Sequence, residues 1–199
     1  RIKKGKMKTL KFNQTRLDLT QYGLKISLDL NRTIRSIIEK KKNYSDLMDR
    51  AIDISSHIYL VNQYLLKKIE KLNILLHEGF VNTESEYYQS DFTIVKTMLN
   101  VSVFKIQSCS EFNISMSFSL EELELKLASQ LKNLIVLSQN APSDYANNYR
   151  AEMKVIPGIK LDIYQLIFFA MKHSRHHLKQ IATLTKINDA LETDMLLHK

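Results

Sequence analysis

The chain has 199 residues, 44% hydrophobic and 25% charged, which is the length and composition of one soluble globular domain. Four glycines and two prolines are too few turn-forming residues for a β-sandwich, a barrel or a glycine-rich phosphate loop, and they favour an all-helical fold. The net charge of +8 would suggest nucleic acid, but residues 1–11 carry six basic residues and no acid, which leaves +2 on the rest.

Two further features bear on where the chain works. It holds no stretch of about 18 apolar residues that could span a membrane. The N-terminus lacks the apolar core of a signal peptide, and the single cysteine, Cys109, has no partner for an internal disulfide. We therefore expect a cytoplasmic protein that binds neither a membrane nor nucleic acid.

Helical spacing of apolar residues predicts two long helices in the first half of the chain. Residues 1–16 are interpreted as a basic, solvated tail, followed by a helix from about Leu17 to Lys42 whose last turn holds Lys40, Lys41 and Lys42. The second helix should follow the capping candidates Asn43 and Ser45 and run to about Leu76. Its apolar stripe comprises Leu47, Ala51, Ile54, Ile58, Val61, Leu65, Ile69, Leu72 and Leu76.

The middle of the chain is less regular. Gly79 is suited to a helix C-cap, a short helix capped by Asp91 or Thr93 is expected through Phe104, and residues 110–118 alternate like an extended segment. Ser119 and Glu122 form a capping box that should open a third long helix, ending near Asn140 before Pro142.

The last long helix should begin after a loop over residues 141–160 that Pro157 and Gly158 close. Asp162 is its expected cap. Four long helices predict an all-α four-helix bundle, with a longer connection between the second and third of them, as one domain over residues 17–187, followed by a tail over 188–199. The inward stripe of the last helix is expected at Ile163, Leu166, Ile167, Ala170, His173, His177, Ile181 and Leu184.

Three of the six histidines fall in the segment HSRHH. His173 and His177 are four residues apart, so on a helix their imidazoles can reach one metal ion from the same face. The alternative is two buried histidines with backbone or carboxylate partners. A third ligand would have to come from another helix, and His57, midway along the second helix, is the candidate. His176 points elsewhere on the helix, and His77 and His198 are expected at a helix end and in the tail.

The segments SSHIYLVNQYLLKKI and IPGIKLDIYQLIFFAMKHSRHHLKQI closely resemble the DinB-like (DinB/YfiT-type) four-helix-bundle superfamily, over roughly Leu17 to Ile187. The chain departs from the family in having no tryptophan before the second helix. The resemblance implies that His57, His173 and His177 bind one divalent ion, nickel, zinc or iron. It also implies a homodimer and an activity on a low-molecular-weight thiol, as in bacillithiol S-transferases and mycothiol-dependent maleylpyruvate isomerases.

Three functional hypotheses remain open at this point. The first is a metal-dependent enzyme, a thiol S-transferase or a hydrolase, that activates a thiol or water for transfer to an electrophile. Its general acid and base are unknown, because no Asp or Glu has a spacing that marks it as catalytic, and Cys109 lacks an activating context. The second is a non-catalytic, metal-binding stress-response protein, and the third is a bundle that has lost its function.

Overall fold

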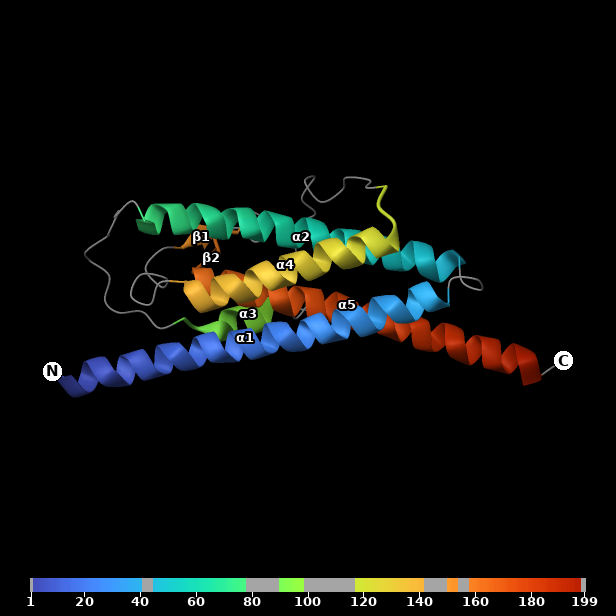
Figure 1. Ribbon diagram of the computed structural model, residues 1–199, viewed down its shortest axis with the longest axis horizontal. Helices are drawn as coiled ribbons and strands as arrows, with labels where there is room; N and C mark the ends of the chain where they lie inside the picture. The colour runs from blue at the N-terminus through green and yellow to red at the C-terminus, as the bar shows by residue number, and fades with distance from the viewer. Residues whose placement is uncertain are drawn as a thin grey trace.

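The computed structural model (Figure 1) describes residues 2–40, 45–77, 90–98, 117–141, 150–153 and 158–197. Its helices and strands are α1 (Ile2–Glu39), α2 (Ser45–His77), α3 (Phe92–Met98), α4 (Leu120–Asn140), β1 (Ala151–Glu152), β2 (Lys160–Leu161) and α5 (Ile163–Leu197). The prediction of an all-α fold is confirmed, because helices make up nearly all of the described chain and the strands form one short hairpin. In the described part of the chain, no helix is long and apolar enough to cross a membrane.

Helices α2 and α4 have the bounds that the sequence predicts. Helix α4 begins with the expected capping box: the backbone N–H of Glu122 donates to the Ser119 hydroxyl, and the Glu122 carboxylate accepts from the Ser119 backbone N–H. These two bonds satisfy donors that a helix N-terminus otherwise leaves unpaired. They therefore fix the first turn of the helix at Leu120.

The two terminal helices are longer than expected. Helix α1 starts at Ile2, so the backbone of the segment interpreted as a tail is helical, and α5 continues beyond residue 187 to Leu197. The other end of α1 is shorter, because the helix stops at Glu39. The prediction that Lys40 lies in the last turn is therefore wrong. Its ammonium instead lies 2.6 and 2.7 Å from the two carboxylate oxygens of Asp189 on α5.

The short helix α3 is capped by Asp91, one of its two predicted caps, whose carboxylate accepts from the backbone N–H of Thr93 at 2.8 Å. Its predicted end near Phe104 lies outside the described residues, as do Gly79, Cys109, Pro142, Pro157 and His198. The predicted extended segment is described only for residues 117–118, which are not helical.

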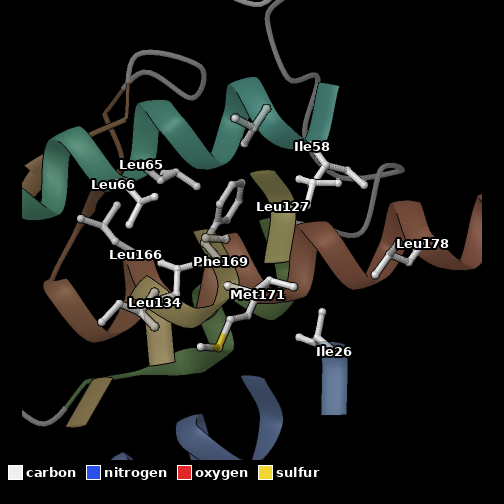
Figure 2. Close-up of a cluster of buried hydrophobic side chains, with 14 of the residues drawn as sticks. Ile26, Ile58, Leu65, Leu66, Leu127, Leu134, Leu166, Phe169, Met171 and Leu178 are labelled. Atoms are coloured by element: carbon white, nitrogen blue, oxygen red, sulfur yellow. The ribbon is translucent and has the colours of Figure 1, made fainter. Parts of the chain in front are cut away.

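The four long helices pack side by side around one core, with α1 and α5 running in one direction and α2 and α4 in the other (Figure 1). Helix α2 contacts α4 and α5, and α1 contacts the same two helices from the other side. Figure 2 shows apolar side chains from all four helices meeting in the space between them. This core is buried as the predicted stripes require, while Leu24 and Leu28 of α1 lie on its exposed outer face.

A short antiparallel hairpin, which the sequence does not predict, sets the start of α5. Strand β1 pairs with β2 so that Ala151 lies opposite Leu161, and Gly158 in the connection has a φ of 80°, which glycine adopts without strain. Directly after β2, Asp162 forms a second capping box. Its carboxylate accepts from the Gln165 backbone N–H at 2.8 Å, and the Gln165 side chain accepts from the Asp162 backbone N–H at 3.0 Å.

Candidate metal centre

The candidate site is a cluster of three histidines contributed by two helices. His57 comes from the middle of α2, and His173 and His177 come from successive turns of α5. Because α2 and α5 pack against each other in opposite directions, residues in the middle of one helix face the middle of the other. The pairing of two distant segments that the sequence analysis expected is thus present.

The three imidazoles lie close enough to hold one metal ion. One ring nitrogen from each histidine can be chosen so that all three atoms lie within 4.8 Å of one another. The Nε2 atoms of His173 and His177 are 3.0 Å apart. Two nitrogens bound to one tetrahedral zinc at about 2.0 Å are about 3.3 Å apart, so this spacing is close to that of a ligand pair.

The placement of the Gln180 amide assigns one tautomer to each of the two α5 rings. His177 Nδ1 lies 2.7 Å from the Gln180 side-chain oxygen, which can only accept, so Nδ1 carries the hydrogen and Nε2 carries the lone pair. His173 Nε2 must then donate to His177 Nε2. The Nδ1 atom of His173 is left as a buried nitrogen without a hydrogen-bond partner.

Burial keeps the rings neutral. It lowers the pKa of His57 and holds the pKa of His173 well below its ordinary value of 6.5, with a further contribution from the neighbouring histidines. The pKa of His177 falls to about 4, mainly because of burial and partly because of His57 and His176. Neutral imidazole is the form that binds a metal, so none of the three rings has to lose a positive charge before binding at neutral pH.

The surroundings hold the rings on their helices. The ring of Phe169, one turn before His173 on α5, stacks on the His173 ring at an interplanar angle of 11°. On the core side, the side-chain amide of Asn62 donates to the Ser174 hydroxyl at 3.1 Å, which joins α2 to α5 next to the cluster. Both Asn62 and Ser174 are fully buried, so this bond is shielded from competing water.

These observations fit a divalent transition metal. Within the described residues the cluster contains histidine alone, and neutral nitrogen donors suit zinc, nickel and iron better than magnesium or calcium, which prefer oxygen. Three protein ligands leave coordination positions for a small molecule.

The structure separates the other histidines from the cluster. His176 is exposed and its Nε2 accepts a hydrogen bond from the Gln180 side-chain amide at 3.2 Å, while His77 is the last residue of α2. The contacts of Gln180 and of Asn62 were not predicted from the sequence. The available signals were Gln180, a polar residue three positions after His177, and Asn62, a polar residue within the apolar stripe of α2.

Comparison with known proteins adds no relative. No family model matches the chain, and neither a curated protein nor a solved structure matches it. The geometry of the cluster therefore has to carry the functional interpretation.

Proposed function

We propose that this protein is a metal-dependent enzyme of the DinB-like four-helix-bundle type, with His57, His173 and His177 as ligands of one nickel, zinc or iron ion. The observation that carries the proposal is the convergence of three neutral imidazoles, from two helices distant in sequence, within 4.8 Å. The resemblance of the two histidine-bearing segments to that superfamily supports the same assignment.

A divalent ion held by the three rings would supply Lewis acidity that lowers the pKa of a bound thiol or water, so that a nucleophile forms near neutral pH. The chain's own contribution is to hold the imidazoles neutral and oriented. Burial keeps the rings from taking up a second proton. The contacts of Gln180 with His177 and of Phe169 with His173 restrict how these two rings turn. The substrate class that we propose is a low-molecular-weight thiol together with an electrophile.

The deciding experiment measures metal content per chain by plasma mass spectrometry, on protein purified without a chelator or a histidine tag. We expect one ion per chain in the parent and its loss in His57→Ala and His177→Ala. His77→Ala is the matched control, because it removes a histidine from the same helix as His57, about 30 Å further along. A parent that refuses added zinc and nickel would contradict the proposal.

A second assay separates turnover from binding alone. The loaded protein is incubated with a thiol and an epoxide or haloarene, and the product is followed by mass spectrometry. Product that disappears in His57→Ala supports the enzyme. Stoichiometric metal without product over a panel of thiols favours the non-catalytic stress-response protein.

A further inference from the structure

The side chain of Gln180 contacts two histidines at once. Its oxygen lies 2.7 Å from His177 Nδ1, and its nitrogen lies 3.2 Å from His176 Nε2. Gln180 follows His176 by four residues and His177 by three, so its side chain can reach both from the next turn of α5. Gln180 is exposed, so it adds little to the apolar core.

The direction of the amide decides where the His177 hydrogen sits. As observed, the oxygen faces His177, which requires the hydrogen on Nδ1 and leaves the Nε2 lone pair beside His173 and His57. The reversed amide would donate to Nδ1 and move the hydrogen to Nε2, where it would block the position of a ligand. In this direction the Gln180 side-chain nitrogen also lies 3.2 Å from His176 Nε2.

We propose that Gln180 is a positioning residue that fixes the Nδ1–H tautomer of His177 by holding its side-chain oxygen against that nitrogen. This inference rests on the proposed function, because the direction of the His177 Nε2 lone pair matters for metal binding. The tautomer itself is a property of the metal-free protein and can be tested without any ion. Hydrogen-bond partners of metal-bound imidazoles generally set ring orientation and ligand basicity.

Two measurements on four proteins test the proposal. Nitrogen-15 NMR of the imidazole rings reports which His177 nitrogen is protonated in the metal-free state, and competition with a chromophoric chelator gives the zinc dissociation constant. The proteins are the parent, Gln180→Leu, which removes both amide contacts, Gln180→Glu, which keeps an acceptor at the same reach, and Lys179→Leu. Lys179 is the exposed residue next to Gln180, and its substitution controls for a change at the same helix surface.

We expect the parent to show the Nδ1–H form and Gln180→Leu to show a mixture of tautomers, with zinc bound about 10- to 100-fold more weakly. Gln180→Glu and Lys179→Leu should keep both the tautomer and the affinity. Circular dichroism of each variant verifies that the helices are intact.

The two possible failures are distinguishable. An unchanged His177 tautomer in Gln180→Leu overturns the positioning role, whether or not the parent binds zinc. A parent that refuses zinc but whose His177 tautomer responds to Gln180→Leu supports the positioning role and overturns the proposed function. A tautomer that responds equally to Lys179→Leu also overturns the assignment to Gln180.

Discussion

Asn62 of α2 and Ser174 of α5 are hydrogen-bonded to each other at 3.1 Å, and both residues are fully buried. The Ser174 hydroxyl in turn donates to the carbonyl of Ala170 at 2.8 Å, which anchors the pair to the helix backbone. A buried polar pair of this kind is satisfied in only one alignment of the two helices. It therefore fixes the alignment in which His57 faces His173.

Removing one member of this pair should cost stability. Asn62→Ala leaves the Ser174 hydroxyl without its donor and opens a small cavity, so the free energy of unfolding should fall by about 1–3 kcal/mol in urea titrations. Asn62→Leu combined with Ser174→Ala should recover part of the loss, since an apolar pair needs no partner. The double variant should still bind metal more weakly than the parent. An unchanged metal affinity would show that the Asn62–Ser174 hydrogen bond does not set the alignment of the two helices.

Gly23 of α1 lies against side chains of α4 and α5. A Cβ atom at this position would lie 2.6 Å from Cγ1 of Ile135 on α4 and 2.8 Å from Cε of Met171 on α5. Alanine is the better helix former by about 1 kcal/mol, but overpacking a core costs about 1–3 kcal/mol, so Gly23→Ala should lower the melting temperature.

Two matched variants locate the effect at this contact. Gln21→Ala, at an exposed position of the same helix, should leave the melting temperature nearly unchanged. Adding Ile135→Ala to Gly23→Ala should make the Gly23 substitution less harmful than it is alone, because the opposing atoms are removed. Additive losses in the double variant would show that the two sites are not in contact.

The stability of the metal-free protein should depend on pH through the histidine cluster. In the unfolded chain each histidine takes up a proton near its ordinary pKa of 6.5, whereas folded His177 does so only near pH 4. Between these values the unfolded state binds more protons than the folded state. The free energy of unfolding should therefore fall as the pH is lowered from about 6.5 to about 4.

Denaturant titrations across this interval measure that dependence. His177→Gln removes one of the contributing groups, so its stability should vary less steeply with pH than that of the parent. His77→Gln serves as the control for loss of a histidine elsewhere. A parent whose stability is flat over the interval would show that the buried rings are not excluded from protonation.

The capping box at the start of α5 gives a further prediction. Asp162→Ala removes the acceptor for the Gln165 backbone N–H and should destabilise the protein by about 1–2 kcal/mol. Burial raises the pKa of the Asp162 carboxyl, so its charge opposes folding near neutral pH. Asp162→Asn keeps the acceptor without the charge and should be at least as stable as the parent in thermal unfolding at pH 7.

Much of this architecture follows from local sequence rules. The apolar stripes of α2, α4 and α5 are predictable because the residues that recur at helical spacing are also the buried ones. Ser119 and Asp162 mark helix starts because their capping hydrogen bonds join residues within four positions of each other. The cluster was predictable for a related reason: His173 and His177 share a face by helix geometry, and His57 was the remaining mid-helix histidine.

What escaped prediction depends on contacts between distant residues or on weak local signals. The first residues of α1 hold lysines without an apolar stripe, so periodicity gave no sign of a helix there. The strands β1 and β2 have two residues each, too few to show alternation. The Lys40 pairing with Asp189 requires knowing that α1 ends beside α5, which is a property of the packed molecule.

The order of the helices along the chain has a consequence for synthesis. His57 emerges from the ribosome early, whereas His173 and His177 follow more than a hundred residues later on α5. During translation, α1, α2 and α4 can meet before α5 has been made, but a nascent chain at that stage holds a single imidazole of the cluster. The proposed metal site would therefore be complete only in chains in which α5 has docked, so metal loading would report completed folding.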